Sequence, residues 1–336
     1  MPTAFVTGAT GFIGGHVALA LLENGWKVRA LKRDNSNLLC LHANDIHWCT
    51  GDIRNFDLLC QAMAGCEAVF HVAADYRLWA RVTAEVYESN VRGTENILQA
   101  ALLQGVDRVI HTSSVGALGL NRDGTPANEM TPVRLKDMVG HYKRSKFLAE
   151  RKAEGFIRQG LPVIIVNPST PVGPGDHKPT PTGKIIVDFL NGKMPAYLNT
   201  GLNLVHVRDV ARGHLLALEQ GKIGQKYILG NQNLTLAEIF SLLQQISNIP
   251  APRFRLPYRP VFCLACINEV VSRMTGAEPL IPFEGVKMAN RYMFFDPSKA
   301  VLELGLPQTP VTAALEEAVT WYMENGYVKK MAESGS

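Results

Sequence analysis

The residues Val6-Thr7-Gly8-Ala9-Thr10-Gly11-Phe12-Ile13-Gly14 decide the fold of this 336-residue chain. A short apolar run, Ala4–Val6, leads into three glycines spaced G-x-x-G-x-x-G, and a helical apolar pattern begins at Val17. Glycine adopts the backbone angles of a tight turn, and its missing side chain lets a pyrophosphate approach the free N–H groups of a helix N-terminus. The stretch therefore predicts a strand, a turn and a helix that bind a dinucleotide, provided that the surrounding sequence agrees.

Composition narrows the class of protein. Hydrophobic residues make up 46% of the chain and charged residues 19%, which suits one large α/β domain with a smaller lobe. The net charge of +4 is too small to indicate a nucleic-acid partner. The start has no basic leader region, and no apolar run is long enough to span a bilayer. We therefore expect a cytoplasmic protein with no transmembrane segment.

Cysteine spacing gives no evidence of a metal site or a disulfide framework. Cys263-x-x-Cys266 has the spacing of half a zinc site but lacks a second ligand pair. It lies in an apolar helical pattern, so we interpret it as a pair of buried thiols. No metal is predicted.

Strands alternate with helices along the first half of the chain. Apolar runs of strand length cover 27–31, 46–50, 68–74, 108–114 and 163–166, and amphipathic helical patterns separate several of them. This alternation predicts a doubly wound parallel sheet of the Rossmann type, with ligands at the carboxyl ends of the strands. Proline and glycine become dense after Pro168, so we expect a dinucleotide-binding domain over 1–168 and a smaller, mostly helical substrate lobe over 169–330. Residues of about 203–230 are expected to return to the first domain.

The end of the second predicted strand bears on the choice of cofactor. In this fold an acidic residue there binds the ribose 2′-hydroxyl, whereas an arginine accommodates a 2′-phosphate. Lys32 and Arg33 stand at that point. They favour NADP(H), although they are also explained as solvated cations, and the adjacent Asp34 leaves NAD(H) possible.

Other strand ends supply further cofactor contacts. Asp52 and Ile53 follow the third strand, where a carboxylate can meet the adenine amino group. Ala73 and Ala74 end the fourth, where small side chains let a flat cofactor pass. Thr112 stands near the end of the fifth strand, which finishes in hydroxyl side chains.

Three side chains have the chemistry for proton transfer. Tyr142 and Lys146 are four residues apart, so they share a helix face, and Ser114 stands at a strand end. Free tyrosine has a pKa of about 10, and a nearby ammonium and a positive nicotinamide favour the phenolate. Lys146 can also hold the nicotinamide ribose, and Ser114 the substrate oxygen. Taken alone, the pair is an ordinary helix motif; its order after the glycine turn favours catalysis.

Five motifs in this order resemble the extended short-chain dehydrogenase/reductases over nearly the whole chain: Gly8-x-x-Gly11-x-x-Gly14, Asn90-Val91-x-Gly93-Thr94, Tyr142-x-x-x-Lys146, Asn167-Pro168 and His206-Val207-Arg208-Asp209-Val210. The resemblance implies catalysis by Ser114, Tyr142 and Lys146. The predicted cofactor contacts also include Tyr142, Lys146, Asn90, Asn167, Pro168 and Ser169. Lys32 replaces the aspartate typical of the NAD-binding sugar epimerases of this family, which again favours NADP(H).

Two subgroups of that family are similar to this chain. The chain resembles the hopanoid-associated sugar epimerases over the stretches 73–79, 140–146, 167–174 and 178–183. It resembles the dihydroflavonol 4-reductases at Val28-Arg29-Ala30, Arg33 and Asn167-Pro168. The first resemblance implies an NAD(P)-dependent epimerase or dehydratase, and the second an NADPH-dependent ketone reductase. A non-catalytic regulator that senses NADP(H) is an alternative of another class. The family often pairs through two helices of the large domain, which makes a homodimer possible.

A cluster after the fourth strand is the candidate substrate site. Arginine and aromatic side chains suit a sugar ring, a phosphate or a phenolic ring, and they are provided here by Asp75, Tyr76, Arg77 and Trp79. Asn203 and His206 precede a later helix and are also placed at the substrate, which we expect to be a sugar nucleotide or a small ketone or alcohol. Lys178, Lys184 and Arg208 either reach a substrate diphosphate or are surface cations. The apolar helix over Val261–Met274 either packs on the main domain or rests on a membrane.

Overall fold

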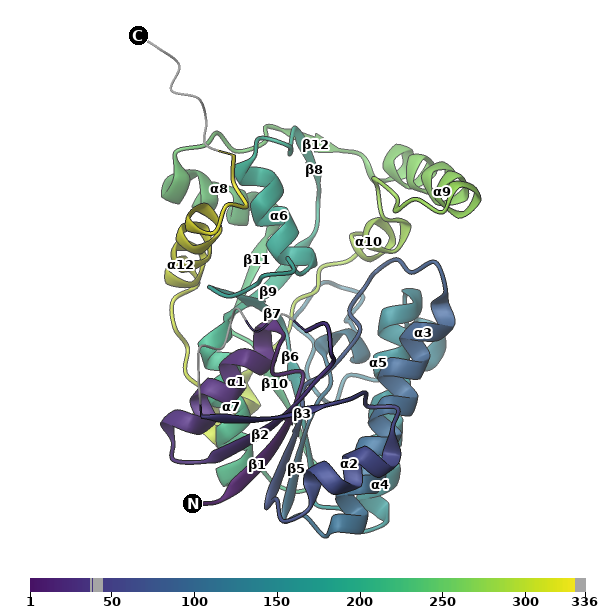
Figure 1. Cartoon of the computed structure of the whole chain (residues 1–336). Coiled ribbons are helices and arrows are strands. Elements are labelled where there is room, and N and C mark those ends of the chain that lie inside the picture. The colour runs from purple at the N-terminus through teal and green to yellow at the C-terminus, as the bar shows by residue number, and fades with distance from the viewer. Residues whose placement is uncertain (37, 39–44, 330–336) are drawn as a thin grey trace.

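The computed structural model describes residues 1–36, 38 and 45–329, so Cys40 and the predicted lobe end at residue 330 lie outside it. Seven parallel strands form the central sheet in the order β10-β6-β5-β4-β1-β2-β3 (Figure 1). Their bounds are β1 (Thr3–Thr7), β2 (Lys27–Lys32), β3 (Ile46–Thr50), β4 (Ala68–His71), β5 (Arg108–Thr112), β6 (Val163–Pro168) and β10 (Lys226–Leu229). The predicted doubly wound parallel sheet is confirmed.

The chain reverses its direction of strand addition between β1 and β4. β1 pairs with β2 on one side and with β4 on the other, so consecutive strands diverge at this point. In open parallel sheets such a reversal leaves a crevice beyond the carboxyl ends of the strands, where ligands bind. Gly8 follows β1 directly, and the glycine turn therefore lies at this crevice.

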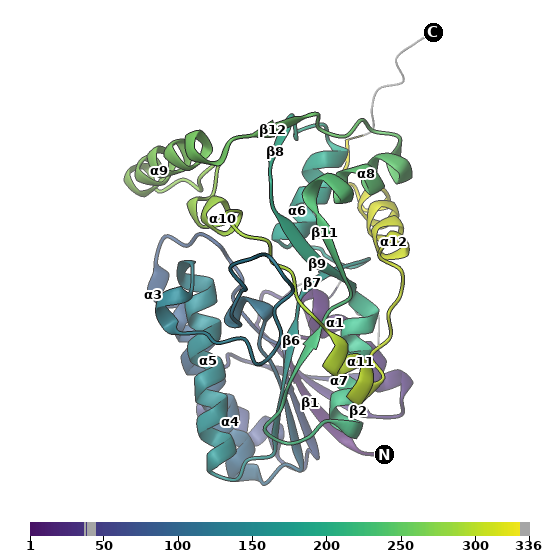
Figure 2. The same ribbon diagram turned by 180° about the vertical axis from the view of Figure 1, so that it is seen from behind.

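Helices cover both faces of the sheet. One face carries α1 (Phe12–Glu23), α7 (Val207–Gln220) and α11 (Ser298–Leu304), which lies beside α7 in Figure 2. The other carries α2 (Phe56–Met63), α4 (Gly93–Gln104) and α5 (Gly140–Arg158). Neighbouring residues of β1 serve opposite faces, since Phe5 packs in the second core and Val6 in the first. This alternation follows from the two-residue period of a strand.

A second lobe lies over the carboxyl end of the sheet (Figure 1). Its core is made by α6 (Pro181–Leu190), α8 (Leu236–Ser247) and α12 (Val311–Glu324) against a sheet of β7 (Thr170–Val172), β9 (Gly201–His206) and β11 (Gln232–Thr235). A further pair joins β8 (Ala196–Leu198) to β12 (Phe254–Leu256). The lobe thus contains two small sheets that its apolar pattern did not indicate, because strands of three to six residues are too short to show a period.

Helix α9 (Tyr258–Thr275) stands beside the lobe with α10 (Phe283–Met288). Phe262 contacts Phe283 with ring centroids 5.5 Å apart, so one face of α9 is packed. The opposite face exposes Leu264, Ile267, Val270 and Met274, which packing on the main domain does not explain. Cys263 is exposed as well, so its interpretation as a buried thiol is wrong.

The described residues form neither a bilayer-spanning helix nor a metal-binding cluster. No helix among residues 1–36 and 45–329 has the length and apolar character needed to cross a bilayer. Within the same part of the chain, no group of three or more His, Cys, Asp or Glu side chains is placed to hold a metal ion.

Candidate active site

The glycine turn joins β1 to α1 with no room for side chains at two positions. Gly8 has φ of +77°, and a Cβ atom there would lie 2.7 Å from the nitrogen of Ala73. A Cβ atom on Gly14 would lie 2.0 Å from the carbonyl oxygen of Gly8. The N–H of Gly15 makes the bond to Gly11 O, so the N–H groups of the first turn, those of Phe12, Ile13 and Gly14, precede the intrahelical ladder. Thr10 and Gly11 complete the turn, which offers these donors to an anion.

The carboxyl ends of β2 and β3 lie next to each other at the same edge of the sheet as this turn. Lys32 closes β2, and its carbonyl oxygen accepts from the N–H of Gly51 at 2.8 Å. The Asp52 carboxylate binds the Arg54 guanidinium, with Oδ1 2.8 Å from Nε, and this contact lowers the pKa of Asp52. The exposed Arg33 adds to that lowering, so it lies near the same carboxylate. The side chain of Ile53 packs against Gly93 of α4 rather than toward solvent.

Ser114 and Tyr142 meet at the carboxyl end of β5. The Ser114 side chain accepts from the N–H of Gly116 at 3.0 Å and lies close enough to the Tyr142 hydroxyl to lower the pKa of that group. Burial raises the pKa of Tyr142, and Ser114 lowers it by less. The expectation of a lowered pKa is therefore not met within the protein alone, because burial has the larger effect.

Lys146 lies one helical turn along α5 from Tyr142. Its Nζ donates to the carbonyl oxygen of Thr112 at 2.7 Å, and the residue is 3% exposed. Burial lowers the pKa of Lys146 to about 8, while Glu150 acts in the opposite direction. Thr112, predicted as a cofactor contact, thus anchors the lysine through its backbone.

Asn167 and Glu150 hold the Ser114 backbone in place. The Nδ2 of Asn167 donates to Ser114 O at 3.0 Å and to Glu150 Oε2 at 3.0 Å. Glu150 is fully buried, accepts from Ser113 Oγ at 2.6 Å and pairs with Lys226. This network connects β5, β6, β10 and α5 behind the candidate site.

Two buried polar atoms at the carboxyl end of β6 have no partner among the described residues. They are Oδ1 of Asn167 and Oγ of Ser169, which flank Pro168. Buried polar groups are ordinarily hydrogen-bonded, so such atoms at the end of a strand fit a bound polar ligand. Together with the free N–H groups of α1, they offer polar groups to the pyrophosphate and to one end of a dinucleotide.

Three neutral histidines lie beneath Lys146 and Thr112. His71 bonds Thr7 Oγ1 through Nδ1 at 2.8 Å and Thr94 Oγ1 through Nε2 at 2.9 Å. The rings of His71 and His111 are 5.4 Å apart, and His214 bonds Thr112 Oγ1 at 2.9 Å. Burial lowers the pKa of His71 to about 3, with Lys146 adding to the effect, and lowers that of His214 to about 4. The same causes lower the pKa of His111.

These histidines make the fold sensitive to acid. The unfolded chain binds their protons below about pH 6.5, whereas the folded chain does not until lower pH, so stability is lost as pH falls from 6.5 toward 4. We expect H214Q to reduce the slope of unfolding free energy against pH by about 1 kcal/mol per pH unit in this window. Urea unfolding at a series of pH values between about 7.5 and 4.5 measures this slope. The exposed His47 supplies the control, since H47Q should leave the slope unchanged; equal slopes for wild type and H214Q would contradict the assignment.

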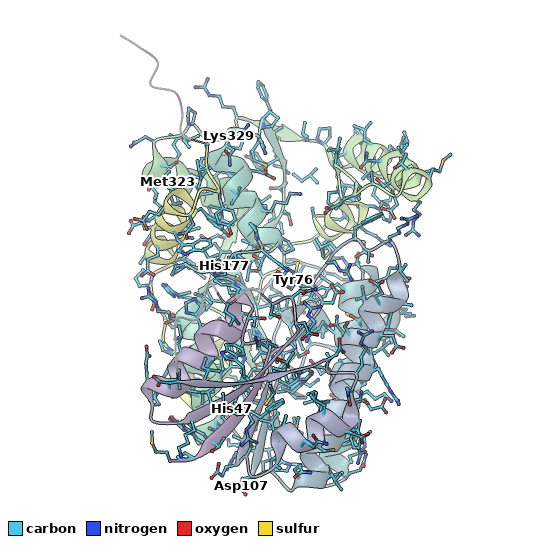
Figure 3. All side chains as sticks on the ribbon, in the orientation of Figure 1. His47, Tyr76, Asp107, His177, Met323 and Lys329 are labelled. Carbon is cyan, nitrogen blue, oxygen red and sulfur yellow. The ribbon has the colours of Figure 1, made fainter. Side chains whose placement is uncertain are left out.

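The loop after β4 lies between the sheet and the second lobe. Asn90 accepts from the N–H of Asp75 at 2.7 Å and donates to its carbonyl at 2.8 Å, so this predicted cofactor contact holds the loop. Ala73 donates to Thr7 Oγ1 at 3.2 Å. The Tyr76 hydroxyl donates to the carbonyl of Lys178 at 3.1 Å, and Figure 3 labels Tyr76 and His177 where sheet and lobe meet.

The structure brings the predicted substrate cluster of this loop together. Arg77 forms an ion pair with Asp75, Nη2 to Oδ2 at 2.6 Å, and a second one with Glu85. Ala74 precedes this pair in the loop, and Trp79 lines a small cavity with His141 and Glu284. Because Arg77 is already paired, a substrate anion would have to share it or displace Asp75.

Three other predicted substrate contacts are engaged elsewhere. Asn203 is 1% exposed, accepts from the N–H of Asn231 and donates to Phe295 O, so it joins β9 to two later segments. His206 caps α7 by accepting from the N–H of Arg208 at 3.0 Å. Arg208 pairs with Glu317. Through these contacts the three side chains connect elements of the protein.

Two residues near Tyr142 were missed. Lys143 is 8% exposed, although the sequence placed it only on a helix. Glu284 of α10 accepts from the N–H of His141 at 2.9 Å, at the N-terminus of α5, where Gly140 has φ of +80°. No local pattern indicates Glu284, because its contact spans the two lobes.

Comparison with known proteins places the chain in a family. The model of the NAD dependent epimerase/dehydratase family matches residues 4–230. A putative dihydroflavonol 4-reductase of Synechocystis is 47% identical over 97% of this chain and 96% of its own. Sterol demethylase protein B of Methylococcus capsulatus is 34% identical over 97% and 100%.

This chain is also similar to a solved structure. The dTDP-glucose 4,6-dehydratase DesIV of Streptomyces venezuelae, determined with NAD bound, superposes with a TM-score of 0.78 at 25% identity, covering 97% of this chain and 99% of its own. The family is dependent on a nicotinamide dinucleotide, and its members include oxidoreductases and epimerases. On its fold, its glycine turn and these matches, the chain belongs to the NAD dependent epimerase/dehydratase family, the extended short-chain dehydrogenase/reductases.

Proposed function

We propose that this protein is an NAD(P)(H)-dependent oxidoreductase that moves hydride to or from an alcohol or ketone carbon, with Ser114, Tyr142 and Lys146 as its catalytic residues. The observation that carries the proposal is the proximity of Ser114 to Tyr142, close enough to lower the pKa of the phenol, one helical turn from the buried Lys146. These groups lie at the carboxyl edge of the sheet that carries the glycine turn. Two hydroxyls converging beside a buried ammonium are suited to proton exchange at a carbonyl oxygen.

Each residue has a distinct task in this proposal. The N–H groups of Phe12 to Gly14 bind the pyrophosphate, Lys146 binds the nicotinamide ribose, and Asn167 and Ser169 bind the nicotinamide end. When bound, the nicotinamide ring supplies or accepts the hydride. Tyr142 donates its proton to the ketone oxygen as that oxygen becomes an alkoxide, and Ser114 holds the same oxygen by a hydrogen bond. The raised pKa of Tyr142 keeps the phenol protonated and ready to donate in the reductive direction.

Net ketone reduction is the version that we favour. It is supported by the 47% identity to a putative dihydroflavonol 4-reductase and by Lys32 and Arg33 at the end of β2, where a 2′-phosphate would bind. NADPH is then a stoichiometric reductant. Steady loss of its absorbance with a panel of ketones tests this version, and no loss with any ketone would contradict it.

A sugar epimerase or dehydratase is the second candidate. It is supported by the family model and by the similarity to a dTDP-glucose 4,6-dehydratase over nearly the whole chain. In this version the cofactor is oxidised and reduced within one turnover, so sugar nucleotides change without net NADPH loss. The association with hopanoids rests on the motif resemblance alone. Chromatography of sugar nucleotides incubated with catalytic NAD(P)⁺ separates the two versions.

Cofactor choice has its own test at Arg33. We expect R33A to weaken NADPH binding by about 10-fold, the cost of a lost charge-assisted hydrogen bond, and to change NADH binding by less than about twofold. Calorimetric titration of the variant with NADPH and with NADH measures both affinities. Lys27 is exposed at the opposite end of β2, so K27A is the matched control and should change neither affinity. An equal loss for NADPH and NADH would remove Arg33 from the 2′-phosphate site.

A further inference from the structure

Lys143 is a buried cation without an anionic partner in the described structure. The residue is 8% exposed, and its Nζ donates to the thioether sulfur of Met293 at 3.6 Å. No carboxylate among the described residues lies within ion-pair distance of it. The other two lysines of this region differ, because Lys146 donates to a carbonyl oxygen and Lys226 pairs with Glu150 and Glu154.

An ammonium in this position is incompletely solvated. Burying a charge is costly unless it is paired, and a thioether sulfur is only a weak acceptor. Burial lowers the pKa of Lys143 to about 8, and no other group offsets that effect. With this pKa, the charged form of Lys143 exceeds the neutral form by about tenfold at pH 7. The site therefore holds a positive charge that an oxyanion would stabilise.

Two contacts bear on the position of the Lys143 side chain. A Cβ atom on Gly116 would lie 3.2 Å from Ser114 Oγ and 3.4 Å from Lys143 Cγ, so the lysine stem and the serine hydroxyl both lie next to Gly116. Lys143 also follows Tyr142 on α5. Met293, which Nζ contacts, is joined to β9 of the second lobe through Gly201 at 2.9 Å. The lysine stem thus lies in the neighbourhood of Ser114, and its charged end reaches Met293 toward the second lobe.

We propose that Lys143 binds an anionic group of the substrate, a carboxylate or a phosphate, whose neighbouring carbonyl oxygen lies on Ser114 and Tyr142. This inference rests on the proposed function, since it takes that pair as the reacting centre. A cofactor phosphate is a poorer occupant, because the glycine turn at β1 already offers backbone donors for the pyrophosphate. Lys143 would then select charged ketones over their neutral analogues.

Binding to the protein saturated with oxidised cofactor tests the inference without turnover. Two pairs of probes are titrated calorimetrically: 4-oxocyclohexanecarboxylate against its methyl ester, and dihydroxyacetone phosphate against dihydroxyacetone. In the wild type at pH 7 we expect the anion of at least one pair to bind about 10-fold or more tightly than its neutral partner, as one charge-assisted hydrogen bond gives. The pair that shows the preference distinguishes a carboxylate from a phosphate.

Lys143→Met removes the charge and keeps most of the side-chain volume, so it should reduce that preference to near unity. Lys136 is an exposed lysine of the neighbouring segment, and K136M is the matched control that should keep the full preference. Cofactor affinity of each variant, measured in the same titrations, verifies that it is folded. No anion preference in the wild type, or an unchanged preference in K143M, would overturn the inference. These outcomes are independent of the proposed reaction, because no proton or hydride moves in this assay.

Discussion

Replacing Tyr142 with phenylalanine is expected to lower kcat by about 10²- to 10⁴-fold, the contribution typical of a positioned general acid. The phenol is the proton donor in the proposed reaction, and Ser114 is the neighbour that lowers its pKa. The ring itself remains, so packing around α5 and the binding of the cofactor should change little. Turnover of whichever ketone or sugar nucleotide the wild type accepts, with cofactor affinity from calorimetry, gives both numbers.

A second tyrosine supplies the control for this experiment. The Tyr87 hydroxyl bonds Nδ1 of His141, the residue before Tyr142, at 3.1 Å. Y87F also removes one phenolic hydroxyl, and we expect it to retain kcat within about threefold, since it loses one ordinary hydrogen bond. Full activity in Y142F would refute the assignment of the proton donor. Cofactor binding with no turnover in the wild type on any substrate would instead favour the regulator.

Gly14→Ala is expected to abolish measurable cofactor binding and to destabilise the fold by about 3 kcal/mol. A Cβ atom at this position would lie 2.0 Å from the carbonyl oxygen of Gly8, far inside contact distance. That oxygen belongs to the backbone, so it cannot move aside as the end of a flexible side chain can. The turn would have to open, which displaces the N–H groups at the start of α1 from the phosphates. Urea unfolding and calorimetric titration of NADPH and NADH measure the two effects.

Gly155 is the matched control for this substitution. It also lies within a helix, α5, but the nearest atom to its Cβ position is the flexible end of Arg158 at 3.9 Å. G155A should raise stability by up to about 1 kcal/mol, because alanine loses less backbone entropy in a helix. If G14A binds cofactor as the wild type does, the glycine turn is not the pyrophosphate site.

Much of the first domain was predictable because its signals are local. The strand, turn and helix over residues 3–23 follow from hydrophobic periods and glycine spacing, both of which act over neighbouring residues. The second lobe was predicted less well. β8 and β12 have three residues each and pair with one another across a long stretch of chain, so no period within either one indicates a strand.

The residues of the candidate site were likewise predictable only in part. Tyr142 and Lys146 were visible as a helical pair, and Ser114 as a hydroxyl at a strand end. Asn203 and His206 were predicted at the substrate because they precede a helix start, and Arg208 was predicted to be either a diphosphate contact or a surface cation. In the structure their side chains contact Asn231, the α7 N-terminus and Glu317. Polarity at a strand end identifies a donor or acceptor but cannot identify its partner.

The amino-acid sequence by itself determined the parallel sheet, the glycine turn and the residue types available for proton transfer, since these depend on spacing along the chain. Only the tertiary structure decided which side chains are already paired and which are not. Lys143 and Arg208 are both cations near predicted substrate positions, but Arg208 pairs with Glu317, whereas Lys143 contacts the sulfur atom of Met293 and no carboxylate of the described residues. Burial and pairing depend on segments distant in sequence, and these two properties set the charge that a ligand meets.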